Sequence, residues 1–249
     1  MDISHLIHMN TNFPKSFAWI LGLSIIIAFA VFSYSFYSAR QLDNSLSVTG
    51  SARKQVVSDS VKWMSGFSRT VLQQDLKSGY AQMAKDQAIV TKFLQEKGIA
   101  DSEINISTVF MGQNYYYDKG ASTPKEYNLN QTVEVKSSDV QKITDIAKNI
   151  QGLIDQGVIF STQNLEYYYS KLSELRVSLL AEAMKDAEAR AKSIVESGGA
   201  KVGPLKTASM GPVQVLSVGS QDVMDYGSYD TSKIDKDVMV TVRAAYTIK

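Results

Sequence analysis

The stretch SVKWMSGFSRTV, residues 60–71, decides the fold because its apolar side chains recur at alternate positions. Val61, Trp63, Phe67 and Val71 fall on one side of an extended chain, and the other side is mostly polar. This period of two predicts a strand with one face in a core and the other in solvent. The neighbouring segments must therefore supply elements that cover the apolar face.

The next segment, residues 76–97, has the spacing of a helix rather than of a strand. Its stripe is interrupted by Gln87, and Gly98 follows as a stop signal. The stripe consists of Leu76, Tyr80, Met83, Val90 and Leu94. The pattern predicts one helix that lays this stripe against the strand.

Three further strands and a helix complete this part of the chain. INISTVFMGQNYYY (104–117) is predicted as one strand with Ile104, Ile106 and Phe110 in phase, and YNLNQTVEVK (127–136) as the next. Ser138-Asp139 starts a helix that runs to about residue 150, and VIFSTQNLEYYY (158–169) is a strand. The order β-α-β-β-α-β over residues 60–169 predicts a ferredoxin-like core of the α+β class.

A long helix and strand-forming residues follow this core. Residues 171–196 are rich in alanine and carry one stripe, and residues 238–248 alternate cleanly. The stripe is Leu172, Leu175, Leu179, Ala183, Ala187 and Ile194; the inward strand positions are Val238, Val240, Val242, Ala244, Tyr246 and Ile248. We expect the core to be extended by this helix and a C-terminal strand pair.

The N-terminal stretch FAWILGLSIIIAFAVFSYSFYSAR begins at Phe17 and carries no charge before Arg40. Residues 17–37 would form a helix of roughly 32 Å, which matches the hydrocarbon core of a bilayer. The triplet Ala28-Phe29-Ala30 also resembles a signal-peptidase site, but the apolar run continues past it. The stretch favours a retained transmembrane anchor, and a cleaved signal peptide stays the alternative.

These features predict four parts of the chain. They are an N-terminal segment (1–16), the anchor or uncleaved signal (17–37), a linker (38–45) and one α+β domain (46–249). The basic residues flanking the anchor are too few on either side to settle its orientation.

Composition excludes several classes of chemistry. The chain has no cysteine, and both histidines, His5 and His8, precede the anchor. The folded region therefore has no thiol nucleophile, no Ser-His-Asp triad and no Cys- or His-based metal site. The net charge is +1 with interspersed signs, which argues against nucleic-acid binding. We expect no catalytic residues, no cofactor and no bound metal, and hence a protein that is not an enzyme.

Two tyrosine triplets are the most unusual local features. Each closes a predicted strand, and tyrosine offers a large contact area at low entropic cost. The candidate interaction surface is therefore Tyr115, Tyr116, Tyr117, Tyr167, Tyr168 and Tyr169. In the alternative interpretation, which we favour, alternate tyrosines of each triplet pack in the core and the others lie on the surface.

An acidic loop precedes the last strand. Several carboxylates in one loop are what a hard divalent cation prefers, but the spacing is not that of an EF-hand, and Lys233 and Lys236 dilute the charge. The carboxylates are Asp222, Asp225, Asp230, Asp235 and Asp237. We therefore interpret the segment as a solvated loop.

Self-association is expected from strand edges. YNLNQTVEVK and VMVTVRAAYTIK carry few of the charges, prolines or bulges that protect an edge strand. Confinement to a membrane plane raises the effective concentration of such edges. The sequence thus predicts a cyclic homo-oligomer formed through these strands and the alanine-rich helix.

Four segments also resemble a known family. LSVTGSARKQVVSDSVKWMSGFS (46–68) resembles the opening of the SIMPL domain (DUF541), with its short strand, V-x-G-x-(G/A) turn and long strand. GIADSEINISTVFMG, YNLNQTVEVKSSDVQKITDIAKNIQGLIDQG and LLAEAMKDAEARAKSIVESGGAKVGPLKTAS resemble its later blocks. Ala52 and Ser58-Asp59 replace the second glycine and the Pro-Asp that are common in the family, so the first turn is expected to differ.

The resemblance implies a bacterial envelope protein that often self-associates and is loosely linked to stress tolerance. The family offers no catalytic residues to carry over. We expect a single-pass inner-membrane protein with its domain in the periplasm, acting by self-assembly or through a protein partner that the sequence does not identify. The alternative is a small-ligand or lipid-binding module with a pocket between sheet and helices.

Overall fold

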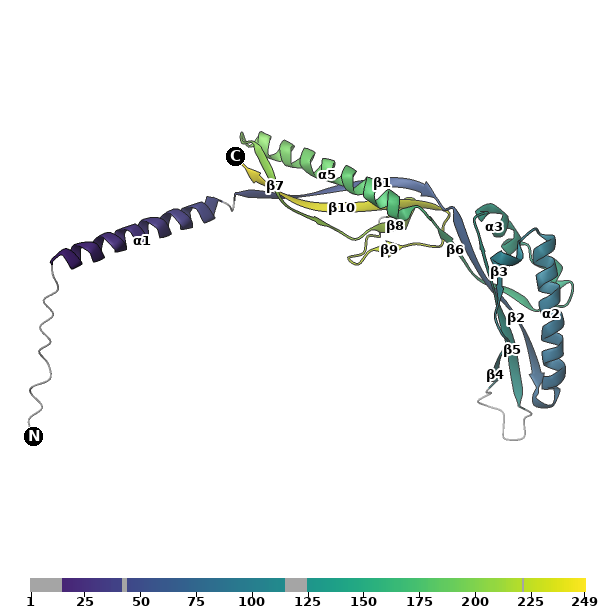
Figure 1. Cartoon of the computed structure of the whole chain (residues 1–249). Helices are drawn as coiled ribbons and strands as arrows, with labels where there is room; N and C mark the ends of the chain where they lie inside the picture. The colour runs from purple at the N-terminus through teal and green to yellow at the C-terminus, as the bar shows by residue number, and fades with distance from the viewer. Residues whose placement is uncertain (1–14, 42–43, 115–124, 221) are drawn as a thin grey trace, which may run out of the picture. The chain divides into compact units, whose positions relative to one another are not determined.

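The computed structural model describes residues 15–41, 44–114, 125–220 and 222–249. They form a mixed α+β protein with an N-terminal apolar helix, two sheets and a long helix (Figure 1), so the predicted α+β class is confirmed. The chain divides into two compact units. One comprises residues 1–49, 187–209 and 243–249, and the other residues 50–186 and 210–242.

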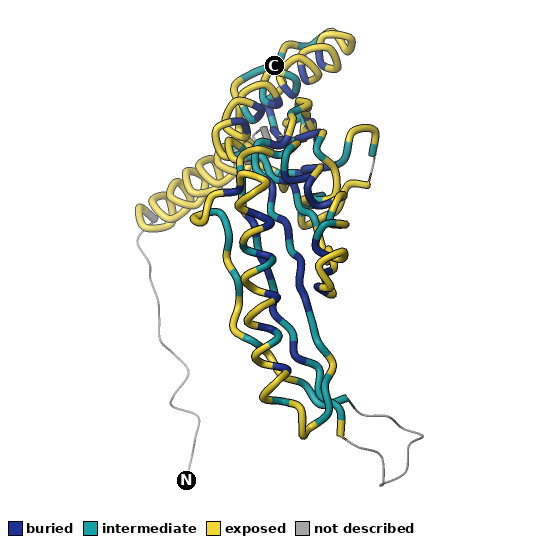
Figure 2. The backbone as a smooth tube through the Cα atoms, turned by 90° about the vertical axis from the view of Figure 1, so that its right-hand side faces the viewer, coloured by how far each residue is buried: buried dark blue, intermediate teal, exposed yellow. Residues whose placement is uncertain are grey.

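The N-terminal helix α1 (Lys15–Gln41) contains an apolar segment, Ser16–Ser38, that is long enough to cross a membrane. None of this segment is buried against the protein, as the tube in Figure 2 also shows. The hydroxyl of Ser24 donates a 2.8 Å hydrogen bond to the carbonyl of Leu21, which leaves that donor satisfied without water. The helix is compatible with a membrane anchor and with a signal sequence.

The first sheet is built around β2 (Ser60–Leu72). β5 (Glu126–Ser137) and β6 (Phe160–Tyr168) pair with it on opposite sides, both antiparallel. β3 (Ile104–Ile106) and β4 (Phe110–Asn114) pair with the far side of β5, which sets the order β3-β5-β2-β6 with β4 also on β5. The predicted inward side chains Val61, Trp63 and Phe67 are all buried.

One face of this sheet is covered by α2 (Leu76–Glu96), α3 (Val140–Lys148) and the short α4 (Gln151–Ile154) (Figure 1). Two 3-10 turns, Gln73–Asp75 and Asp101–Glu103, flank α2. The largest fully buried side chains between sheet and helices are Trp63, Phe67, Met83, Leu94, Leu129, Ile143 and Leu153.

The termini of these helices follow the expected local signals. Asp139 caps α3 by accepting a hydrogen bond from the backbone N–H of Lys142, so the predicted start there is confirmed. Gly98 has φ of 75° just after α2, a conformation that glycine adopts without steric cost. The predicted stripe of α2 is wrong at Tyr80, which is 42% exposed, whereas Asp86 and Phe93 are buried.

The predicted strand 104–117 is broken within its described part. Ile106 pairs with Val133, but Phe110, four residues later, pairs with Asn130, only three residues back along β5. One extra residue therefore lies between β3 and β4, and a one-residue slip exchanges the two faces of a strand. Phe110, predicted to point inward with Ile104 and Ile106, is instead 66% exposed. The sheet has five strands where the ferredoxin-like prediction had four.

The second sheet is larger than the predicted strand pair. It contains β1 (Ser45–Val57), β7 (Val202–Met210), β8 (Gln214–Ser217), β9 (Ser228–Tyr229) and β10 (Asp235–Ile248). Its order is β1-β10-β8-β9, with β7 also on β10. β1 runs unbroken where the resemblance implied a turn after a short strand, and it begins at Ser45, inside the predicted linker.

The long helix α5 (Leu172–Ser197) confirms the predicted helix 171–196. Leu175 and Leu179 pack with Val215, Val238 and Val240 in one hydrophobic cluster. The buried stripe then continues through alanines, whose small side chains permit close packing, and ends at Val195: Ala183, Ala187, Ala191 and Val195. Ile194, which was placed in the stripe, is 52% exposed.

The strand-edge prediction is wrong for both strands that it named. YNLNQTVEVK lies in β5, which is paired on one side with β2 and on the other with β3 and β4. VMVTVRAAYTIK lies in β10, between β1 and the strands β7 and β8. Strong alternation identified good strands, but strands buried on one face read the same at the centre and at the edge of a sheet.

Candidate functional site

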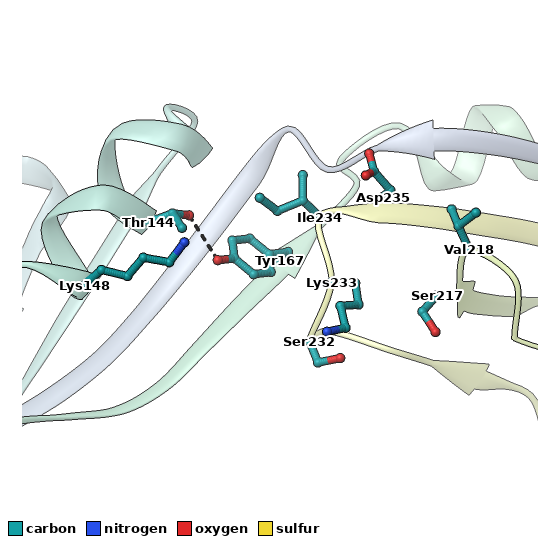
Figure 3. A pocket seen from close by; sticks show the side chains of 9 residues that line it. All are labelled: Thr144, Lys148, Tyr167, Ser217, Val218, Ser232, Lys233, Ile234 and Asp235. Carbon is teal, nitrogen blue, oxygen red and sulfur yellow. Dashed lines mark hydrogen bonds between the residues drawn. The ribbon is translucent and has the colours of Figure 1, made fainter.

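A pocket of about 450 Å³ lies in the unit formed by residues 50–186 and 210–242 (Figure 3). Its lining comes from α3, β6, the end of β8 and the turn before β10. The lining residues are Thr144, Lys148, Tyr167, Ser217, Val218, Ser232, Lys233, Ile234 and Asp235. A volume of this size is in the range of small-molecule sites.

On the α3 side, two hydroxyl groups form a fixed pair. The hydroxyl of Thr144 lies 2.7 Å from the carbonyl oxygen of Val140, which can only accept, so Thr144 donates there. The hydroxyls of Tyr167 and Thr144 are 3.0 Å apart, so Tyr167 must donate to Thr144. Both hydrogens are therefore committed, and the Tyr167 oxygen can only accept from a ligand.

The opposite wall is the turn Asp230–Asp235, which hydrogen bonds from Tyr167 and Ser58 hold in place. The backbone N–H of Tyr167 donates to the carbonyl of Thr231 at 2.8 Å. Ser58 donates both its backbone N–H and its hydroxyl to the carbonyl of Ile234, at 2.9 and 2.8 Å. A wall braced in this way is formed before any ligand arrives.

Lys236 is the central brace of that turn. Its side chain is fully buried, and its ammonium donates to the carbonyls of Asp230 and Lys233 and lies 5.6 Å from the ring centre of Tyr229. Burial lowers the pKa of Lys236, and the nearby Asp230 charge opposes that change. The acidic loop thus places a cation of its own beside the carbonyls of Asp230 and Lys233.

Asp230 is the carboxylate that faces this turn. It accepts the backbone N–H and the hydroxyl of Ser232, both at 2.7 Å. The backbone N–H of Ser232, then its hydroxyl, lower the pKa of Asp230 against the effect of burial, and the Ser217 hydroxyl adds to this. The hydroxyl hydrogen of Ser232 thus also points at a carboxylate.

The other carboxylates of the acidic loop do not gather around one point. Asp222 lies beside Ser220, and Asp237 is buried and 3.6 Å from Arg53. Within the described ranges, no group of three or more Asp, Glu, His or Cys side chains is placed to hold a metal ion.

The structure describes only one of the two tyrosine triplets. Tyr115, Tyr116 and Tyr117 lie outside the described residues. Tyr167 is only 6% exposed, so it cannot serve as an exposed anchor; its ring packs in the core and its hydroxyl edges the pocket. Tyr168 and Tyr169 are partly buried.

Both partly buried tyrosines contact Tyr229. The rings of Tyr168 and Tyr229 are 5.8 Å apart, and the Tyr229 hydroxyl accepts the N–H of Tyr169 at 2.9 Å. Burial and a 2.8 Å hydrogen bond to Glu166 raise the pKa of Tyr168 to about 12. These two tyrosines belong to a packed polar cluster.

The face of the first sheet opposite the helices is uncovered and polar. It carries a hollow of about 350 Å³ that Gly66 lines together with amide and hydroxyl side chains. The lining includes Ser68, Asn128, Asn130, Thr132 and Gln163. The side-chain oxygen of Asn128 is buried there without a hydrogen-bond partner, and the exposed Phe110 lies opposite Asn130 in the register.

The alternative prediction was a ligand pocket between sheet and helices. Trp63, Phe67, Met83 and Leu94 fill that space and are at most 2% exposed. The pockets described above instead open at the surface of the unit.

The sequence analysis assigned no role in a site to Lys148, Lys233 or Lys236. One signal for Lys236 was available, because it stands two residues before Val238 and is in phase with the inward positions of β10. Extending that alternation backwards predicts an inward lysine. Lys148 and Lys233 are exposed lysines among many, and only the fold brings them to one pocket.

The sequence was compared with models of known protein families and with curated proteins. Residues 46–246 match the family described as SIMPL, a protein of unknown function (DUF541). Among curated proteins, no relative matches the chain. The family match covers well over half of the sequence and includes both sheets and α5, so the chain belongs to the SIMPL (DUF541) family.

Proposed function

We propose that the protein is a membrane-anchored module of the bacterial cell envelope that works by self-association or by binding another protein, and not by catalysis. The apolar, unburied helix Ser16–Ser38 supports the anchor. In this proposal the helix stays uncleaved in the inner membrane and the domain lies in the periplasm. A role in stress tolerance, which the family resemblance implies, is part of the same proposal.

The observation that carries the interaction is the exposed Phe110 on β4. β4 is at the edge of its sheet, its sequence FMGQN has no charge or proline, and Met111 beside Phe110 is also exposed. An edge strand with such residues is a favourable surface for pairing with another chain. It also borders the uncovered polar face of the sheet. We place self-association at this edge, in place of β5 and β10.

The anchor is tested by carbonate extraction of membranes and by mass spectrometry of the intact chain. We expect a membrane-retained chain that includes residues 17–37 and a domain that added protease reaches only after the outer membrane is opened. A mature chain beginning at Val31 would refute the anchor.

Self-association is tested with the full-length chain in phosphatidylcholine nanodiscs or detergent by light scattering and cross-linking. Phe110→Lys should weaken it about tenfold, as expected for a central aromatic contact. Val177→Lys is the matched control, because Val177 is 69% exposed on α5. A strict monomer at micromolar concentrations, or equal effects of both variants, would contradict the assignment to β4.

A further inference from the structure

The pocket in Figure 3 has a distinctive pattern of donors and acceptors. The hydroxyls of Thr144, Tyr167 and Ser232 already donate to Val140, Thr144 and Asp230, respectively. Their oxygens therefore offer lone pairs, and a ligand group that touches them must be a donor.

The remaining side-chain donors of the pocket are the ammonium groups of Lys148 and Lys233. Figure 3 shows Lys148 ending beside the Tyr167 hydroxyl and Lys233 coming from the turn on the other side of that ring. Within the described residues, neither lysine has a salt-bridge partner, and neither does Asp235. Two cations against one carboxylate favour an anionic group on the ligand, and lysine is a common phosphate binder.

A second hollow, of about 250 Å³, shares Val218 and Asp235 with the pocket. Its other lining residues are Gln55, Val56 and Val57. Three valines make this extension largely apolar, so a ligand can place an apolar group there while its charged group stays near the lysines. All of these residues belong to the same unit.

We propose that the pocket binds a phosphate ester that carries free hydroxyl groups, such as a glycerophosphate, with Lys148 and Lys233 supplying the positive charge that attracts its phosphate. The ligand hydroxyls would donate to the Tyr167 oxygen and to Asp235. These additional hydrogen bonds favour glycerol 3-phosphate over inorganic phosphate, which lacks the alcohol hydroxyls that would donate to Tyr167 and Asp235. The site is separate from the β4 edge and does not depend on self-association.

The same chemistry has two sources, a free metabolite and the headgroup of a lipid. The first arm titrates the full-length chain in phosphatidylcholine nanodiscs with glycerol 3-phosphate, inorganic phosphate and glycerol by calorimetry. The second arm compares nanodiscs with and without phosphatidylglycerol, measuring hydrogen exchange of the turn Asp230–Asp235. Binding in the first arm alone indicates a free ligand, and protection in the second arm indicates a lipid headgroup.

The variants separate the lysines from general charge effects. Lys148→Gln and Lys233→Gln should each weaken binding about tenfold, the value of one charge-assisted hydrogen bond. The matched control is Lys77→Gln, which also removes one charge, from the exposed side of α2. Asp235→Asn should strengthen the binding of inorganic phosphate and reduce the preference for glycerol 3-phosphate.

Three results would overturn the proposal. They are the absence of an effect in both arms, equal losses in the control variant and the pocket variants, and inorganic phosphate binding as tightly as glycerol 3-phosphate. Circular dichroism of each variant distinguishes a lost site from an unfolded protein, because Lys148 and Lys233 are exposed and their loss should leave the fold intact.

Discussion

Asp86 and Lys236 are buried charged side chains in different regions of the molecule, and their surroundings compensate the desolvation in different ways. Under the first sheet, Asp86 of α2 receives two hydrogen bonds from Arg69 of β2, at 2.7 and 2.9 Å, and one from Gln82. In the turn before β10, the Lys236 ammonium is held by two backbone carbonyls and a tyrosine ring, without a carboxylate bonded to it.

The two environments change the pKa values of Arg69 and Lys236 in opposite directions. Hydrogen bonding to Asp86 raises the pKa of Arg69, which favours the charged form of the guanidinium. Burial lowers the pKa of Lys236, so its charge is less secure. We therefore expect the Asp86–Arg69 pair to stabilise the core of the first sheet. Lys236, held by carbonyls, should stabilise only the turn that supplies them.

The largest effect is expected from Asp86→Asn. Arg69 would lose its counter-ion while still partly buried, and removal of one partner from such a pair costs about 3 kcal/mol or more of unfolding free energy. The measurement is urea unfolding followed by the fluorescence of Trp63, which is fully buried in the same core. Asp75→Asn, an exposed carboxylate at the start of α2, is the matched control. Equal midpoints for the two variants would show that the pair does not stabilise this core.

A smaller and more local effect is expected from Lys236→Met. The carbonyls of Asp230 and Lys233 would lose their donor, at a cost of about 2 kcal/mol. Hydrogen exchange of the turn should accelerate, and the Trp63 transition should move less than in Asp86→Asn. Acceleration throughout the first sheet would instead mean that Lys236 supports the whole unit.

The Lys236 charge also has a pH dependence. Because burial lowers its folded-state pKa below the ordinary value of 10.5, the folded chain binds fewer protons there than the unfolded chain. The contribution of Lys236 to stability therefore rises as the pH rises toward 10.5. The difference in unfolding free energy between the wild type and Lys236→Met should grow in favour of the wild type over this range. A difference that stays constant with pH would argue against a lowered pKa.

The smallest effect is expected at Tyr168. Burial and the bond to Glu166 raise its folded-state pKa from 10.0 to about 12, so the folded chain holds this proton more tightly than the unfolded chain. The resulting stability is present below pH 10 and is lost as the pH rises through about 12. In Tyr168→Phe, the unfolding free energy should decrease less between pH 10 and about pH 12. Absorbance titration at the phenolate band should show one fewer late-ionising tyrosine, and an unchanged titration would contradict the assignment.

Much of the fold could be predicted because its signals are local. The alternation of Val61, Trp63 and Phe67 and the stripe of α5 through Leu175 and Leu179 describe which side of an element is apolar, and neighbours along the chain suffice for that. The prediction failed at Phe110, because one extra residue between β3 and β4 exchanges the faces and leaves no mark in composition.

The candidate sites were harder to predict for a related reason. Lys148 and Lys233 are ordinary surface lysines in the sequence, and Tyr167 is one of three identical neighbours. Their role depends on α3, β6 and the turn before β10 meeting in space, which involves residues that are far apart along the chain. No local pattern distinguishes them from other lysines and tyrosines.

The sequence by itself determined the apolar segment that can span a membrane, the α+β class, the helices α2, α3 and α5 with the cap Asp139 and the stop Gly98, and the inward face of most strands. These depend on hydrophobic periodicity and on capping, which act over a few residues. Only the tertiary structure decided that β5 and β10 are central strands, that Phe110 lies at an exposed edge, and that Lys236 is buried. Strand order and burial are set by contacts between distant segments, and their free energy is gained only when those segments pack together.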